Sequence, residues 1–200
     1  MTAIPLGVLD TGSANLASVL AAFRRMGVSP CLVRDADALR RADRLVLPGV
    51  GAFGAVMANL RTLGAADALT ERITNGRPLL AICLGFQVLG VASAEAPGVA
   101  GLGIFGGVTQ RYPASVRVPQ LGWNSVTPTR ADGVVQPGHA FFANSYYLDA
   151  ADDAWSASYA EHGVRFVAAA ERGSQLACQF HPELSGRWGA ALLQRWWDRC

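Results

Sequence analysis

The sequence contains no lysine: all 17 basic residues among its 200 are arginines. Chemistry that forms a Schiff base on lysine is therefore excluded, and so is a phosphate-binding loop that needs a lysine. The arginines are scattered along the chain, and the formal net charge is only +2. Such a chain lacks the basic patch that marks a nucleic-acid-binding surface, and we expect no nucleic acid partner.

Long apolar runs are also missing. No window of about 18 uninterrupted apolar residues occurs, so we expect no membrane-spanning helix and no membrane partner. The N-terminus shows no basic segment followed by an apolar stretch, which is the pattern of a secretory signal. Both absences predict a cytoplasmic protein.

No two of the four cysteines form a CxxC pair, so a zinc site is not expected. The sequence predicts neither a metal nor another cofactor. The hydrophobic fraction of 51% and the charged fraction of 16% are those of a globular chain. A length of 200 residues suits one domain, which we expect to span residues 1–200.

Apolar runs of strand length alternate with helical periodicity over the first 90 residues. Strands are predicted at 4–9, 31–33, 45–47 and 79–82, and helices at 15–26, 37–41, 52–63 and 66–74. This alternation is typical of a parallel sheet with helices on both faces. Such folds bind ligands beyond the carboxyl ends of their strands, where Asp10, Gly49 and Cys83 are expected.

The second half has a different pattern. After a glycine-rich segment at 97–107, short strands are predicted at 116–118, 141–147, 155–159, 166–170 and 176–180, and a helix at 189–199. The expected fold class is α/β. It has an open, mostly parallel sheet covered by helices on both faces, with additional antiparallel strands in the C-terminal half.

Residues 79–87, LLAICLGFQ, hold the most informative feature of the chain. An apolar run ends at Cys83, Gly85 follows, and a helical pattern begins, which is the shape of a nucleophile elbow. The N-terminus of that helix would favour the thiolate, which is the reactive form of the thiol. A buried structural cysteine is the alternative.

Residues 179–183, QFHPE, place an imidazole two residues from a carboxylate at the end of a second apolar run. Pro182 has no N–H and stops the strand, which leaves Glu183 where it could orient His181. Cys83, His181 and Glu183 are the parts of a cysteine–histidine–acid relay. A core histidine held by a backbone carbonyl is the alternative for His181.

Residues 48–51, PGVG, follow another strand. The two glycines around Val50 permit unusual backbone angles and an exposed N–H. Together with the N–H of Leu84, this strip at Gly49 and Val50 could form an oxyanion hole. A plain turn explains the strip equally well.

The combination of these motifs resembles the class I glutamine amidotransferases and, within that family, the glutaminase subunits of imidazole glycerol phosphate synthase. AICLGFQ at 81–87 is similar to the nucleophile motif, and QFHPE at 179–183 to the His–Glu motif. Four further segments narrow the resemblance to that subunit: LPGVGAF at 47–53, DTGSANLASV at 10–19, RVPQLGWNSV at 117–126 and SYY at 145–147.

The resemblance implies an activity. Cys83 would attack the side-chain amide of L-glutamine, and His181 would accept the thiol proton and return it to the departing ammonia. Glu183 would hold the imidazole, the N–H groups of Leu84 and of the Gly49–Val50 strip would stabilise the oxyanion, and water would release glutamate from the thioester. The positions that match substrate-holding residues of the family are Gln87, Glu95, Ser145 and Tyr146.

The resemblance also implies a heterodimer with the cyclase subunit of imidazole glycerol phosphate synthase, to which the ammonia would pass. The cyclase would make imidazole glycerol phosphate and the aminoimidazole carboxamide nucleotide, in histidine biosynthesis. Asn15 and Trp123 match positions at the subunit interface of the family. A place in the buried core is the alternative for Trp123.

Some residues depart from the family pattern. Gln120 and Asn144 stand where His is usual, and Leu184 stands where a basic residue is usual; the other departures are Thr11, Ala14 and Val91. Two other functions therefore stay open. One is a glutaminase that serves anthranilate or pyridoxal phosphate synthesis, and the other is a subunit that docks a partner without catalysis.

Overall fold

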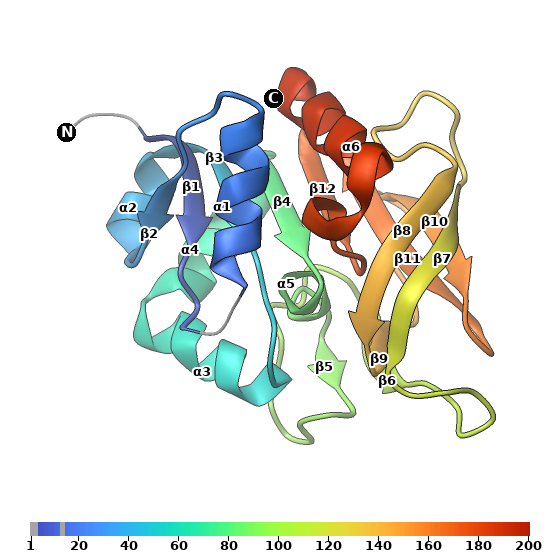
Figure 1. Cartoon of the computed structure of the whole chain (residues 1–200). Helices are drawn as coiled ribbons and strands as arrows, with labels where there is room; N and C mark the ends of the chain where they lie inside the picture. The colour runs from blue at the N-terminus through green and yellow to red at the C-terminus, as the bar shows by residue number, and fades with distance from the viewer. Residues whose placement is uncertain (1–3, 13–14) are drawn as a thin grey trace.

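The fold is built on one mixed sheet of nine strands, in the order β2-β1-β3-β4-β12-β11-β10-β7-β8 (Figure 1). It is described from a computed structural model, which describes residues 4–12 and 15–200. Ala14, one of the departures from the family pattern, lies outside these residues. The first five strands in this order are parallel, and the remaining pairs are antiparallel.

The parallel half contains the predicted alternation of strands and helices. Its strands are β1 (Ile4–Leu9), β2 (Cys31–Val33), β3 (Ala42–Leu47), β4 (Leu79–Ile82) and β12 (Gln175–Cys178). The helices are α1 (Leu16–Arg25), α2 (Ala36–Arg41), α3 (Phe53–Thr62), α4 (Ala65–Thr74), the one-turn α5 (Leu84–Gln87) and α6 (Gly186–Arg199), which a short 3₁₀ helix, η1 (Pro182–Leu184), precedes. Among the described residues, no helix is long and apolar enough to cross a membrane.

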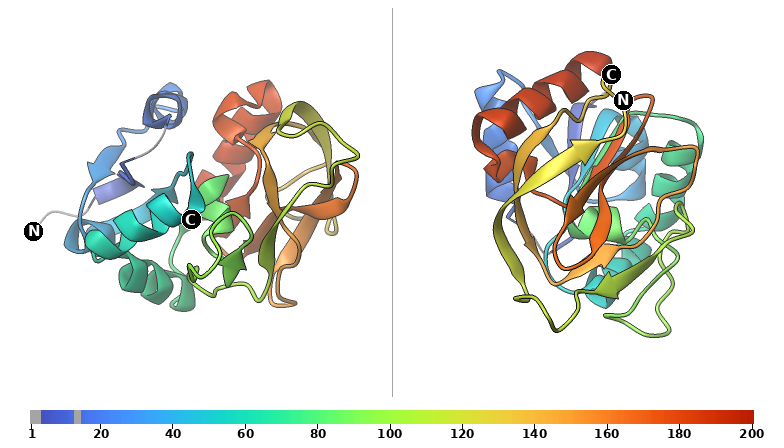
Figure 2. Two further views of the ribbon diagram at one scale, coloured as in Figure 1. Left: turned by 90° about the horizontal axis from the view of Figure 1, so that it is seen from below. Right: turned by 90° about the vertical axis from the view of Figure 1, so that its right-hand side faces the viewer.

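Strand alternation divides the core into two clusters, one on each face of the parallel half. Leu45 and Leu47 pack with α2, α3 and α4, whereas Val46 between them packs with α1 and α6. Figure 2, in its left view, shows these two helix layers on opposite sides of the sheet. Both faces of the parallel strands are therefore apolar, as a parallel sheet requires. The predicted fold class is confirmed.

The antiparallel half is formed by β7 (Gln120–Pro128), β8 (Gly138–Asn144), β10 (Ser156–Glu161) and β11 (Arg165–Arg172). The prediction of a strand at 116–118 is wrong, because these residues form an irregular segment between Pro113 and Pro119. The true strand, β7, lacks an apolar alternation, since only Gln120 and Val126 are buried within it.

A second sheet of three short strands lies beside the large one: β5 (Ala92–Ser93), β6 (Val108–Arg111) and β9 (Tyr146–Leu148). The single strand predicted at 141–147 is therefore two strands, β8 and β9, which belong to different sheets. The break falls at Ser145. Residues of this junction reach the cavity described below.

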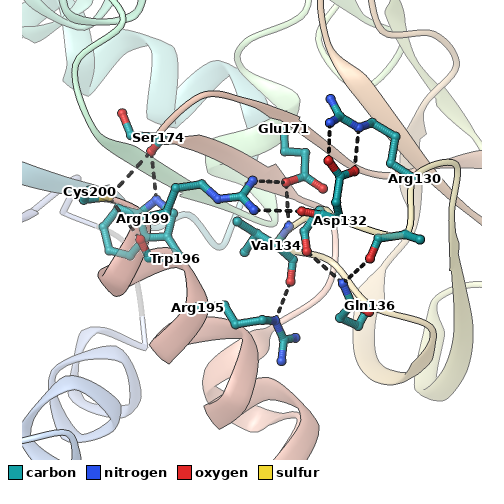
Figure 3. Close-up of polar contacts among 12 residues, drawn as sticks. Arg130, Asp132, Val134, Gln136, Glu171, Ser174, Arg195, Trp196, Arg199 and Cys200 are labelled. Carbon is teal, nitrogen blue, oxygen red and sulfur yellow. Dashed lines mark hydrogen bonds and ion pairs between the residues drawn. The ribbon is translucent and has the colours of Figure 1, made fainter.

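A polar cluster fastens the end of α6 to the antiparallel half (Figure 3). The buried carboxylate of Glu171 on β11 accepts hydrogen bonds from the N–H of Val134 (2.7 Å) and from Arg199 (3.2 Å). Arg199 also donates to the carbonyl of Asp132 at 2.9 Å. Trp196 of the same helix is buried and packs against Phe23 of α1. The helix α6 therefore joins the two halves of the sheet.

Candidate active site

Cys83 adopts a backbone conformation that non-glycine residues avoid. Its φ is +55° and its ψ is −110°, and it is the only described non-glycine residue with a positive φ. Strain of this kind costs on the order of 1–3 kcal/mol and concentrates at functional sites. The turn is held by a 2.8 Å hydrogen bond from the Cys83 N–H to the carbonyl of Cys178. The predicted nucleophile elbow is thus present at the end of β4.

A glycine makes this elbow possible. A Cβ at Gly85 would lie 2.1 Å from the carbonyl oxygen of Leu47, well inside contact distance. The helix after the elbow is shorter than its pattern suggests, because the carbonyls of Val88 and Leu89 accept hydrogen bonds from the 101–105 segment. A helix of one turn supplies a smaller dipole at Cys83 than a longer helix would.

The imidazole of His181 reaches the thiol of Cys83 because of the pairing of two strands. Cys178 of β12 lies opposite Ile82 of β4 in parallel register, so the segments that follow both strands leave the sheet side by side. His181 is hydrogen-bonded to Cys83, and its Nδ1 lies 2.8 Å from Oε1 of Glu183. The imidazole and carboxylate side chains are 7% and 2% exposed. The structure thus brings the three predicted catalytic residues together.

Burial and hydrogen bonding have opposite effects on His181. Burial lowers the pKa of the imidazole, but the hydrogen bonds to Cys83 and Glu183 and their negative charges outweigh it and raise the pKa to about 10. The imidazole therefore keeps its proton at neutral pH when it is paired with a Cys83 thiolate. This is the charge distribution that activates a cysteine nucleophile.

The oxyanion strip lies beside the elbow, but its polar groups face the wrong way for an oxyanion. The N–H of Leu84 donates to the carbonyl of Gly49 at 3.2 Å, so a carbonyl oxygen occupies this donor. Because the peptide bond is planar and trans, the N–H of Val50 points away from that side. A Cβ at Gly49 would lie 2.5 Å from the N atom of Gly85, which explains the glycine. The strip and the elbow are therefore in direct contact.

A cavity of about 190 Å³ opens beside Cys83. It is smaller than the roughly 300–1,000 Å³ that drug-sized ligands need, and its size suits a small molecule such as an amino acid. Seven of the predicted site residues line it: Val50, Cys83, Leu84, Gln87, Glu95, Ser145 and Tyr146. The carboxylate of Glu95 is also anchored, since it accepts the N–H of Phe53 at 2.8 Å where α3 begins.

Two further side chains at this site were not predicted from the residue pattern. Gln179 appeared there only as a letter of the QFHPE motif, yet its amide lies 3.6 Å from the sulfur of Cys83. Asn144 was noted only as a departure from the family, yet it lines the cavity. A signal for Gln179 existed, because it is a polar residue directly after the apolar β12.

The two predicted interface residues are exposed. Asn15 lies at the start of α1, and the side chain of Trp123 projects from β7 with 58% of its surface accessible. The core alternative for Trp123 is therefore wrong. Leu121 is 66% exposed and Leu184 is 39% exposed. Exposed apolar side chains of this size mark an interaction surface when they gather near one another.

Comparison with known proteins agrees with this geometry. Residues 7–198 match the family model described as Glutamine amidotransferase class-I. The HisH subunit of imidazole glycerol phosphate synthase from Methanothermobacter thermautotrophicus is 40% identical over 192 residues, which are 94% of this chain and 96% of that protein. The HisH subunit from Cutibacterium acnes is 41% identical over 197 residues, 96% of each chain.

A solved structure supports the fold. A crystal structure of a glutamine amidotransferase matches with a TM-score of 0.77 at 22% identity, over 96% of each chain. The sequence matches carry the narrower relationship, since they reach about 40% identity over almost the full length of both chains. The chain belongs to the class-I glutamine amidotransferase family and, within it, to the HisH subunits of imidazole glycerol phosphate synthase.

Proposed function

We propose that this chain hydrolyses L-glutamine through a thioester on Cys83 and passes the ammonia to the cyclase subunit of imidazole glycerol phosphate synthase. The cyclase would use it to make imidazole glycerol phosphate and the aminoimidazole carboxamide nucleotide, in histidine biosynthesis. The observation that carries the proposal is the buried Cys83–His181–Glu183 arrangement beside a small cavity, in a chain of the HisH family.

The first half of the reaction forms the thioester. The thiolate of Cys83 attacks the side-chain amide carbon of glutamine, and a carbon–sulfur bond forms. The carbon–nitrogen bond then breaks, and His181 donates its proton to the leaving ammonia. The raised pKa of His181 supports its role as the proton donor in this step, because the imidazole carries the proton at neutral pH.

The second half releases glutamate. Neutral His181 accepts a proton from water as the water attacks the thioester carbon, and the thiolate of Cys83 leaves. His181 is then protonated again, which restores the starting state. Glu183 keeps Nδ1 of the imidazole hydrogen-bonded throughout, so the other ring nitrogen faces the reacting atoms. The roles of Gln87, Glu95, Ser145 and Tyr146 are to hold the glutamine in the cavity that they line.

Catalysis needs one rearrangement. The N–H of Leu84 can bind the oxyanion only when the carbonyl of Gly49 releases it. Rotation of the Gly49–Val50 peptide would free this donor and, because the peptide is planar, would turn the N–H of Val50 toward the same place. We therefore expect the free chain to hydrolyse glutamine slowly and the docked partner to accelerate the reaction by favouring the rotated peptide.

A HisH protein is a subunit and works with a partner subunit, and the exposed surface beside the site suits such a partner. A Cβ at Gly186 would lie 3.7 Å from the ring of Trp123, which places Trp123 next to the segment that carries His181 and Glu183. The N–H of His181 donates to the carbonyl of Phe141, whose ring packs against Trp123. A partner that covers Trp123 on β7 would thus lie next to β8, the strand whose Phe141 carbonyl holds the catalytic histidine. The four free cysteines fit a reducing cytoplasm.

The test is ammonia release from L-glutamine by the purified chain, alone and with a cyclase barrel and its nucleotide substrate. Acceleration by the barrel is expected, and Cys83→Ala should remove about 10³-fold or more of the activity while the variant still binds the barrel. Release that depends on an anthranilate or pyridoxal phosphate synthase instead would reassign the partner. Binding of a barrel without any glutamate release would identify a docking subunit without turnover.

A further inference from the structure

Gln179 is a fully buried side chain that the mechanism above does not use. Its Nε2 lies 3.6 Å from the sulfur of Cys83, and its side chain has no exposed surface. The residue directly follows β12, so strand pairing places it opposite Cys83, which directly follows β4. A buried amide that touches a nucleophile has a chemical effect on it, because an N–H donor stabilises a thiolate more than a thiol.

The orientation of this amide follows from its neighbours. The main-chain carbonyl of Tyr146 can only accept hydrogen bonds, so Gln87 must present its NH₂ group there, at 2.8 Å. The second hydrogen of that NH₂ group points to Oε1 of Gln179 at 2.9 Å. Because Oε1 of Gln179 accepts this hydrogen bond, the NH₂ group of Gln179 faces the sulfur of Cys83. A backbone carbonyl on β9 thus determines which group faces the nucleophile.

We propose that Gln179 is a positioning residue, whose amide holds the thiolate of Cys83 beside His181 and whose own orientation is imposed by Gln87 and the carbonyl of Tyr146. The sulfur then has two donors, one from the imidazole and one from the amide. This inference rests on the proposed function for the identification of Cys83 as the nucleophile. It gives Gln87 a second role besides holding the substrate.

The hydrogen-bonded chain continues beyond Tyr146. Asn144 donates to the same carbonyl at 2.8 Å and to the hydroxyl of Tyr112 at 3.0 Å. That hydroxyl donates to Oε1 of Gln120 at 2.8 Å, at the start of β7. Burial raises the pKa of Tyr112, so the hydroxyl keeps the proton that it donates. Two of the departures from the family pattern, Gln120 and Asn144, are therefore joined through one hydroxyl. They lie in the chain of contacts that sets the amide of Gln179.

The test measures thiolate character directly, without glutamine hydrolysis. The rate of alkylation at Cys83 by iodoacetamide is followed by peptide mass spectrometry from pH 5 to 10, in the free chain. Gln179→Met keeps the bulk of the side chain and removes the donor. We expect about a tenfold slower alkylation at pH 7 and a pH midpoint that moves upward, because a hydrogen bond to a charged group is lost. Gln87→Met should shift the profile in the same direction by less, because it frees the Gln179 amide to turn.

Gln175→Met is the matched control. It removes a second buried glutamine from β12, whose amide bonds to the carbonyl of Ile73 and does not touch Cys83. Its alkylation profile should match the unaltered chain. An unchanged profile in Gln179→Met, or an equal change in Gln175→Met, would overturn the proposal.

A second variant covers the case in which Gln179→Met does not fold. Gln179→Glu keeps the shape and places a carboxylate where the donor was, so alkylation should be slower than in the unaltered chain. Alkylation as fast as in the unaltered chain would contradict the proposal. If the unaltered chain and the barrel release no glutamate, the proposed function fails, but the alkylation result still stands on its own.

Discussion

The two halves of the sheet differ in how far their faces are buried. In the parallel half, all four residues of β4 and all four of β12 are buried, because helices cover both sides. In the antiparallel half, β7 alternates between half-buried and exposed residues over most of its length and carries Trp123 and Leu121 in the open. Cys83 and His181 follow β4 and β12, and β12 is the strand where parallel pairing changes to antiparallel pairing. The candidate site therefore lies where the half with two buried faces ends and the half with an exposed face begins.

Alanine substitutions at two glycines test whether the parallel half accommodates an added methyl group less readily than the antiparallel half does. A Cβ at Gly85 would meet the backbone carbonyl of Leu47, whereas a Cβ at Gly138 on β8 would meet Nε1 of the Trp188 ring at 2.2 Å. A backbone atom in a packed core cannot move aside, but a half-buried side chain can. We expect Gly85→Ala to lower the free energy of unfolding by about 3 kcal/mol and Gly138→Ala by about 1 kcal/mol. Urea denaturation measures both, and equal losses would contradict the contrast.

Two arginines provide the next comparison. Arg72 in α4 is 1% exposed and donates to main-chain carbonyls of Leu39, Ala42, Asp43 and Pro78. Burial lowers the pKa of its guanidinium to about 10. Arg199 binds Glu171 and Asp132 with a side chain that is 39% exposed (Figure 3).

Replacement by methionine should lower the free energy of unfolding by different amounts at the two arginines. Arg72→Met leaves buried carbonyls without donors and should lower the free energy of unfolding by about 2 kcal/mol. Water can replace the exposed Arg199, so Arg199→Met should cost about 0.5 kcal/mol. Thermal unfolding at constant pH measures the difference, and the comparison fails if Arg199→Met costs more.

Binding of the partner should distinguish the exposed residues of the antiparallel half from those of the parallel half. Trp123→Ala should weaken binding to the cyclase barrel about tenfold, because a large aromatic side chain at an interface contributes more than most contacts. Leu32→Ala is the control, since Leu32 is 37% exposed on β2, at the opposite edge of the sheet. It should leave the dissociation constant unchanged in isothermal titration calorimetry. A weaker complex with Leu32→Ala would place the partner on the parallel half.

The pH dependence of stability tests the boundary between the halves. The pKa of His181 is raised from 6.5 to about 10 by folding, so the folded state binds this proton more tightly than the unfolded state. Its contribution to stability is complete below about pH 6.5 and is lost as pH rises toward about 10. Urea unfolding between these values should show a decline that His181→Gln reduces. An equally steep decline in the variant would mean that other groups cause it.

Much of the parallel half could be predicted from residue order because its signals are local. Residues 31–33 and 79–82 were predicted with the bounds of β2 and β4, since continuous apolar runs bounded by turns indicate strands. The strand β7 was missed because its stability comes from pairing with β8 along seven residue pairs, not from an apolar pattern of its own. Long-range pairing leaves no local signal.

The candidate residues show the same division. Cys83, His181 and Glu183 could be named from residue order, because a thiol after an apolar run and an imidazole two positions before a carboxylate are patterns within a few residues. The contact of Gln179 with the sulfur, the use of the Leu84 N–H by Gly49 and the exposure of Trp123 depend on folding. Hydrogen bonds and burial are relations between segments about 35 to 96 residues apart, and these segments meet only when the sheet has formed.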